Sequence, residues 1–188
     1  MTEPNLPLRT DRLLLRPFVD DDLDAFHAMF SSKEAVRYLY WEPRTLDESR
    51  EALERVKTMT SFEPDAPGIR LAAVLPESGT VVGDISLRRV SEEHRQGEVG
   101  YVIHPDHQGL GYATEGTAAL IEVGFRDVGL HRIRASADAR NAASIRVMEH
   151  LGMRREALFV ESEFVKGEWT DEVVYAILAT EWHLARPS

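Results

Sequence analysis

Residues 97–116, GEVGYVIHPDHQGLGYATEG, constrain the fold most, because a strand pattern, a glycine loop and a helix pattern follow one another there. The strand pattern ends at Ile103, the loop contains Gly109 and Gly111, and helical spacing begins at Tyr112. Glycines let a ligand approach the backbone, and the first amides of a helix are unpaired at the positive end of its dipole. This arrangement predicts an anion cradle without Lys or Arg; the alternative is an ordinary glycine turn.

Two common phosphate-binding patterns do not explain this loop. The Walker pattern is absent, and the dinucleotide fingerprint requires a third glycine where Thr114 stands. That fingerprint also requires an acidic residue about 20 residues later, near the next strand, where residues 129–135 read GLHRIRA. A nucleotide triphosphate or dinucleotide site is therefore not expected.

Length and composition limit the classes of protein to which the chain can belong. The 188 residues fit one domain, 1–188, and the absence of cysteine excludes disulfides and a cysteine nucleophile. The longest apolar run, residues 173–179, is too short to span a membrane, and the first residues carry no apolar secretory core. A net charge of −10 argues against nucleic acid as a partner, and the histidines show no metal-ligand spacing. We expect a cytoplasmic protein without a metal and without a membrane partner.

One short segment departs from this acidic character. Residues 131–155 contain six arginines and two acidic residues. The segment predicts either a local anion site or a solvated helix face.

Hydrophobic periodicity predicts a mixed sheet with helices on its faces, an α/β (α+β) fold. Strands are expected at 12–16, 69–75, 80–87, 98–103, 131–137, 157–165 and 170–178. Helices are expected after Asp20–Asp22, after the capping box of Thr45 and Glu48, over 112–126 and over 141–151.

The loop resembles a known family. Gln108 to Ala113, QGLGYA, matches the Q/R-x-x-G-x-G/A signature of the GCN5-related N-acetyltransferases, the GNAT superfamily. LRTDRLLLRPFVDDDLDAF, ARNAASIRVMEHLGMRREA and GEWTDEVVYAILATEW also resemble the branch that acetylates alanine or serine at protein N-termini, including those of ribosomal proteins. The resemblance implies a single domain with a mostly antiparallel sheet of about seven strands, a splayed central strand pair and about four helices.

The resemblance also implies acetyl-CoA as the acetyl donor. Its pyrophosphate would lie on the backbone of the loop, and its pantetheine arm along the exposed edge of the preceding strand, near the start of the 141–151 helix. The residues concerned are Gln108, Gly109, Leu110, Gly111, Tyr112, Ala113 and Thr114 for the loop, Tyr101, Val102 and Ile103 for the edge, and Asn141 and Ser144 for the helix. Arg140 and Arg146 either meet the ribose phosphate or are solvated.

Transfer to an amine requires a base, a donor for the oxyanion and a donor for the departing thiolate. Glu98 is the expected base because it shares one strand face with Gly100 and Val102; the alternative is a solvent-facing or ion-paired glutamate. The amide of Val102 would bind the oxyanion, as the resemblance implies. The family's usual tyrosine acid is replaced by Met148, so Ser144 or solvent would protonate the thiolate.

The acceptor site is expected at Tyr38, Tyr40 and Trp41, with Trp169 opposite; the alternative is that these aromatics fill the core. The prediction is direct acetyl transfer in a ternary complex to a primary amine, either a protein or peptide N-terminus or a small amine. Acetylation of an antibiotic or polyamine, or a non-catalytic acyl-CoA-binding or sensing module, remains an alternative. Exposed strand edges leave a homodimer open.

Overall fold

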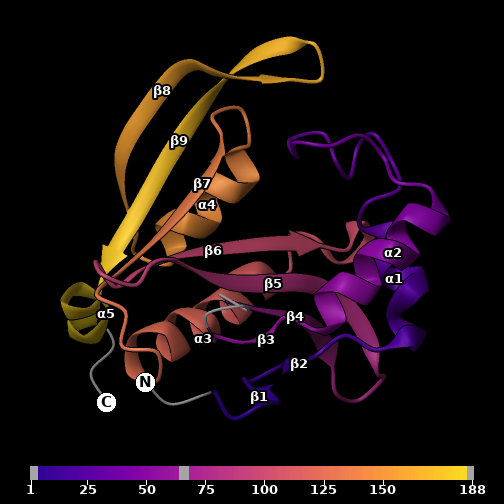
Figure 1. The fold of residues 1–188 in the computed structure, drawn as a ribbon, viewed down its shortest axis with the longest axis horizontal. Helices are drawn as coiled ribbons and strands as arrows, with labels where there is room; N and C mark the ends of the chain where they lie inside the picture. Colours follow the sequence, from indigo (N-terminus) through magenta and orange to yellow (C-terminus); the bar gives the residue numbers. More distant parts are fainter. Residues whose placement is uncertain (1–3, 64–67, 186–188) are drawn as a thin grey trace.

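The structure is a computed structural model that describes residues 4–63 and 68–185 (Figure 1). Its strands are β1 (Leu8–Arg9), β2 (Leu14–Arg16), β3 (Thr60–Ser61), β4 (Gly68–Leu75), β5 (Thr80–Ser91), β6 (Gln96–Ile103), β7 (Arg132–Asp138), β8 (Arg154–Val165) and β9 (Glu168–Leu178). Its helices are α1 (Leu23–Ala28), α2 (Leu46–Lys57), α3 (Tyr112–Arg126), α4 (Ala142–His150) and α5 (Ala179–Ala185), with 3₁₀ turns at Asp20–Asp22 and Pro105–His107.

The strands form one mixed sheet in the order β1-β2-β4-β5-β6-β7-β9-β8, and β3 pairs with β4 beside this path. Helix α3 packs against β5 and β6 on one face, over the larger apolar core. Helices α1 and α2 cover only one end of the opposite face, against β4 and β5, and the β8–β9 hairpin rises at the other end (Figure 1). The middle of that face therefore stays open.

The predicted mixed, mostly antiparallel sheet is confirmed, with nine strands instead of about seven. The two additional strands, β1 and β3, contain two residues each, too few to produce an alternating pattern. The fifth α-helix, α5, follows β9 without a loop, so no turn residue marks its start. The predicted first strand is shorter, and the helix after Asp20–Asp22 begins as a 3₁₀ turn.

Strands β6 and β7 are parallel and pair over three residues only. The pairs are Gln96 with Arg132, Gly97 with Ile133 and Glu98 with Arg134. Beyond Glu98 the two strands separate, although β6 continues to Ile103 on its other partner, β5. The expected splayed central pair is thus present, and the β7-facing backbone of β6 has no strand partner after Glu98.

Helix α3 lies directly on the sheet because it has glycines on its buried face. A Cβ at Gly124 would lie 2.8 Å from Ile133 Cδ1 and 3.0 Å from Leu87 Cδ2. Both neighbours are fully buried, so neither can move aside without disturbing the core. The close contact fixes the helix axis and hence the position of its N-terminus at the end of β6.

Gly124→Ala tests this packing because two effects oppose each other. Alanine favours a helix over glycine by about 1 kcal/mol. Overpacking of a tight core costs about 1–3 kcal/mol, so we expect the variant to be less stable than the parent. Urea unfolding measures the difference. A rise in the free energy of unfolding would contradict the close packing of α3.

Candidate active site

A cavity of about 430 Å³ lies on the open face of the sheet, where β6 and β7 separate. Its walls come from four segments of the chain: β6, β7, the segment before α2, and the β8–β9 hairpin. Residues of these segments that line it include Glu98, Gly100, Val102, Ser136, Asp138, Tyr38, Tyr40, Trp41, Glu163 and Thr170. The cavity therefore lies where the central strands diverge.

The loop after β6 is built to present backbone amides. Gly109 and Gly111 have φ values of 75° and 84°, in the left-handed region that favours glycine. Gly111 is the N-cap of α3, and no side chain caps the helix. The amides of Tyr112, Ala113 and Thr114 thus face outward at the positive end of the helix dipole. These residues fit a diphosphate, as the sequence predicts.

A brace that sequence reasoning missed holds this loop. Arg12, close to β2, donates through Nε to Glu115 Oε2 at 2.6 Å and through Nη1 to the carbonyl of Leu110 at 3.0 Å. Its guanidinium also lies 4.9 Å from the ring centre of Tyr112. The two ends of the brace are about a hundred residues apart, so no local pattern reveals it.

Glu115 is the anchor of the brace, since it also accepts hydrogen bonds from the Thr10 hydroxyl and the Arg12 amide. Burial alone would raise the pKa of Glu115. The hydrogen bonds from Thr10 and Arg12 and the charge of Arg12 outweigh burial, and they lower the pKa below its ordinary value. The Glu115 carboxylate therefore stays ionised, and the positive charge of Arg12 balances it beside the expected anion site.

The N-terminus of α4 brings three predicted residues together. Asn141 Oδ1 accepts a hydrogen bond from the Ser144 amide at 3.1 Å and so caps the helix. The Ser144 hydroxyl lies 2.8 Å from the hydroxyl of Tyr101, which comes from β6. Met148, one turn further along, is fully buried and has no proton to donate.

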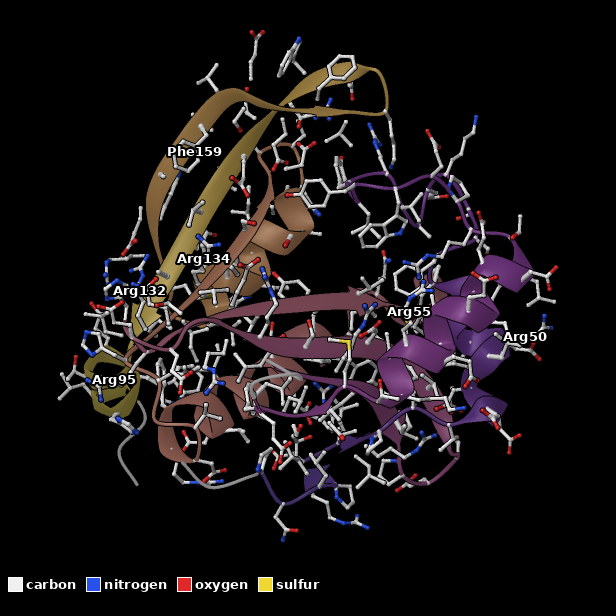
Figure 2. All side chains as sticks on the ribbon, viewed as in Figure 1. Arg50, Arg55, Arg95, Arg132, Arg134 and Phe159 are labelled. Atoms are coloured by element: carbon white, nitrogen blue, oxygen red, sulfur yellow. The ribbon has the colours of Figure 1, made fainter. Side chains whose placement is uncertain are left out.

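Glu98 lines the cavity on the same strand face as Gly100 and Val102, as strand alternation predicts. Its Oε2 accepts hydrogen bonds from Arg88 at 3.1 Å and from Arg134 at 3.0 Å. Arg134 extends from β7, between β6 and the hairpin (Figure 2). The glutamate is thus held by two guanidinium groups, as in the ion-paired alternative considered from sequence.

A second carboxylate, Asp84, was not singled out from sequence. It is 3% exposed, lies opposite Val102 in the β5–β6 pairing and lines the cavity. Arg70 binds it, with Nε at 2.9 Å from both oxygens. Burial favours a lower pKa for Arg70, but the charge and hydrogen bonds of Asp84 raise it overall. An acidic residue inside the apolar run VVGDISL was the available signal.

The three predicted aromatics before α2 line the cavity, and Trp41 also packs on Phe30 at 6.2 Å between ring centres. Trp41 therefore lines the cavity and also packs on the core, and its role in binding the acceptor stays a prediction. Tyr40 lines the opening together with Ser136 on β7 and Glu163 on β8. Burial and the charge and hydrogen bond of Glu163 raise the pKa of Tyr40. The segment before α2 and the hairpin thus meet above the cavity.

Trp169 does not line the cavity, although the sequence predicted it opposite the three aromatic residues in the acceptor site. It is 59% exposed, makes an edge-to-face contact with Phe164 at 5.3 Å between ring centres, and is not among the residues that line the cavity. Its neighbours Glu168 and Thr170 line the cavity instead. Strand alternation explains the difference, because adjacent residues of β9 point to opposite faces.

The two arginines considered for the ribose phosphate lie in different settings. Arg140 donates to Asp138 at 2.7 Å and to Glu168 at 2.9 Å, so its charge is already engaged. Arg146 lies exposed on α4. The arginine-rich segment is mostly committed to ion pairs, with Arg132, Arg134 and Arg154 also bound to glutamates.

Two kinds of feature are absent from the described part of the chain. Within residues 4–63 and 68–185, no helix has the length and apolar character needed to cross a membrane. Over the same residues, no group of three or more His, Asp or Glu side chains is placed to hold a metal ion.

The splayed strands, the glycine loop and the adjoining cavity define an acyl-CoA-dependent acyltransferase. Comparison with known proteins agrees, since residues 12–154 match the acetyltransferase (GNAT) domain family. The chain belongs to this family. It is an acetyl-CoA-dependent N-acetyltransferase, and the predicted family, enzyme class and acetyl donor are confirmed.

Individual relatives cover nearly the whole chain. It is similar to the uncharacterised N-acetyltransferase YnaD of Bacillus subtilis, with 32% identity over 176 residues, 94% of this chain and 99% of the relative. A GNAT acetyltransferase structure from Bacillus anthracis superposes with a TM-score of 0.82 and 32% identity, covering 93% of this chain and 99% of the other. Spermidine N-acetyltransferase from Vibrio cholerae, solved with CoA and spermine, shares the fold with a TM-score of 0.77, 24% identity and coverage of 92% and 99%.

Glu115→Gln tests the brace through pH. Because the folded-state pKa of Glu115 is lowered, its contribution to stability is complete above the ordinary carboxyl pKa of about 4.3 and is lost as pH falls through the folded value. At pH 7 we expect the variant to lose about 1.5–3 kcal/mol of unfolding free energy, the scale of hydrogen bonds to charged groups.

Urea unfolding at several pH values measures this effect. The difference between parent and variant is expected to shrink below about pH 4.3, as the parent's carboxylate becomes protonated. A difference that stays constant down to pH 3 would contradict the brace.

Proposed function

We propose that this enzyme acetylates an α-amino group, at the N-terminus of a peptide or protein or on a small monoamine. The observation that carries the proposal is the position of the cavity. It lies directly beside the unpaired edge of β6, which ends in the glycine loop. A donor extended along that edge would present its acyl end to an amine entering from the open face of the sheet.

The donor would be held almost wholly by backbone groups. Amides from Gln108 to Thr114 would bind the pyrophosphate, and the free edge at Tyr101, Val102 and Ile103 would pair with the pantetheine amides. Asn141 uses Oδ1 for its cap, which leaves its side-chain N–H groups to meet a ligand carbonyl. Acetyl-CoA supplies a thioester carbon to which the amine nitrogen adds as the bond to sulfur breaks.

The residues around that carbon would have three roles. The Val102 amide would donate to the oxygen that gains negative charge. The Ser144 hydroxyl would donate to the departing sulfur. Glu98 would accept the ammonium proton, directly or through water, and its two arginines fix the carboxylate at the cavity wall.

The charges of the cavity favour an acceptor with one ammonium group. Four of the five carboxylates that line it are ion-paired with arginines: Asp84 with Arg70, Glu98 with Arg88 and Arg134, and Asp138 and Glu168 with Arg140. The fifth, Glu163, lies near the uncharged hydroxyl of Tyr40, so its negative charge can attract one ammonium group. A polyamine carries several ammonium groups that need unpaired carboxylates, whereas an α-amine requires one site. An α-amine also loses its proton more readily, with a pKa near 8 against about 10.4 for a lysine-type amine.

The acceptor class is tested by thiol release from acetyl-CoA with matched amines. A short peptide with a free N-terminal serine or alanine is compared with the same peptide blocked at its N-terminus, and with spermidine. We expect kcat/KM for the free peptide to exceed that for spermidine at least about tenfold, about 1.4 kcal/mol of transition-state stabilisation. A preference for spermidine would contradict the acceptor assignment, and binding of acetyl-CoA without turnover of any amine would contradict catalysis.

Glu98→Gln tests the base. The amide preserves the shape of the side chain but accepts a proton far less readily, so kcat is expected to fall about 10²-fold at pH 7. The loss is expected to diminish above about pH 8, where the α-amine is already neutral. An unchanged kcat and pH profile, with folding intact by circular dichroism, would exclude Glu98 as the base.

A further inference from the structure

Two hydroxyl groups meet at the wall of the cavity, where β6 faces the start of α4. Tyr101 Oη lies 2.8 Å from Ser144 Oγ and 3.0 Å from the Ser144 carbonyl oxygen. Both residues line the cavity, and the Tyr101 ring packs against the larger core. The tyrosine therefore contacts the serine in a fixed geometry, and the serine adjoins the path expected for the donor's sulfur.

The tyrosine is suited to orient the serine. Burial raises the pKa of Tyr101 to about 12, although a hydrogen bond with Ser144 partly opposes the rise. The phenol therefore keeps its proton at neutral pH and can donate it to Ser144 Oγ. A serine hydroxyl that accepts this hydrogen bond still has its own proton, which it can direct elsewhere.

A serine hydroxyl in the first turn of a helix has other possible hydrogen-bond partners. It can turn back to a backbone carbonyl or to water, and each choice removes the proton from the cavity. Tyr101 Oη lies within hydrogen-bond distance of both Ser144 Oγ and the Ser144 carbonyl oxygen, and its single proton is donated to one of them at a time. When that proton goes to Ser144 Oγ, the serine oxygen has a fixed donor and the serine's own proton is left for the cavity.

We propose that Tyr101 is a positioning residue that donates to Ser144 Oγ and thereby directs the Ser144 hydroxyl toward the departing thiolate of coenzyme A. This inference rests on the proposed function. Met148 stands where the family's usual tyrosine acid would be, but it is fully buried and has no polar hydrogen. The proposal gives part of that tyrosine's task, stabilisation of the thiolate, to Tyr101 on β6.

The proton balance of this arrangement is simple. The carbon–sulfur bond breaks as the carbon–nitrogen bond forms, and the thiolate leaves with the electron pair. Ser144 stabilises that charge with a hydrogen bond and retains its own proton. The ammonium group loses one proton to the base or to water before it attacks, and its nitrogen loses a second proton to water after the carbon–nitrogen bond forms. The thiolate takes up a proton from solvent.

The pKa of the coenzyme A thiol bound to the enzyme tests the proposal without any knowledge of the acceptor. It is measured by ultraviolet absorbance of the thiolate during a pH titration, with the protein alone as the blank. A free cysteine thiol has a pKa of about 8.5, and a hydrogen bond to the thiolate lowers the pKa of any thiol. We expect Tyr101→Phe to reduce the acid dissociation constant of the bound thiol about 3- to 10-fold, and Ser144→Ala to reduce it at least as much.

The double variant distinguishes action of Tyr101 through Ser144 from independent effects of the two residues on the thiolate. If Tyr101 acts through Ser144, the Tyr101→Phe/Ser144→Ala protein matches Ser144→Ala alone. Tyr175→Phe is the matched control, because it removes the hydroxyl of another buried tyrosine. That hydroxyl is 3.4 Å from Glu149, and Tyr175 is outside the residues that line the cavity. That control is expected to leave the thiol pKa at its wild-type value.

Three results would overturn the inference, and they can be told apart. An unchanged thiol pKa in folded, coenzyme A-binding Tyr101→Phe would exclude the positioning role. Additive effects in the double variant would show that Tyr101 acts without Ser144. Failure of wild-type protein to bind coenzyme A would instead overturn the proposed function, and the inference with it.

Discussion

The short parallel pairing of β6 and β7 is the constraint on which the site depends. Three residue pairs hold the strands together up to Glu98, and beyond that point β6 keeps only its antiparallel partner. Unpaired backbone groups in a sheet require other partners, and a ligand with amide groups can supply them. The same divergence opens the cavity between Val102 and Ser136. Donor binding and acceptor access thus follow from one feature of the sheet.

The remaining elements position groups around that opening. The close contact of α3 with the sheet at Gly124 places the uncapped N-terminus of α3 at the end of β6. Arg12 holds the loop in place by its hydrogen bond to the carbonyl of Leu110. Helices α1 and α2 cover only part of the open face, and the hairpin rises over the rest (Figure 1). In the proposed function the acceptor would therefore enter from the face opposite α3.

The sequence predicted the fold class, the glycine loop and the strand face of Glu98 because each depends on local patterns. Alternation along one strand brings Glu98 and Val102 to the cavity, and glycine spacing marks the loop. The same rule, applied to β9, indicates that Trp169 lies on the face opposite Thr170. The Arg12 brace and the Asp84–Arg70 pair were missed because they join distant segments, which no local pattern records.

The central claim is that the main-chain amides of the loop bind the pyrophosphate of the donor without help from cations. Titration of isotope-labelled protein with coenzyme A, followed by amide NMR, tests it most directly. The largest shifts are expected at Gly109, Gly111 and the first turn of α3, and the free edge of β6 should respond with them. Binding that leaves these amides unmoved while arginine side-chain signals shift would contradict the account.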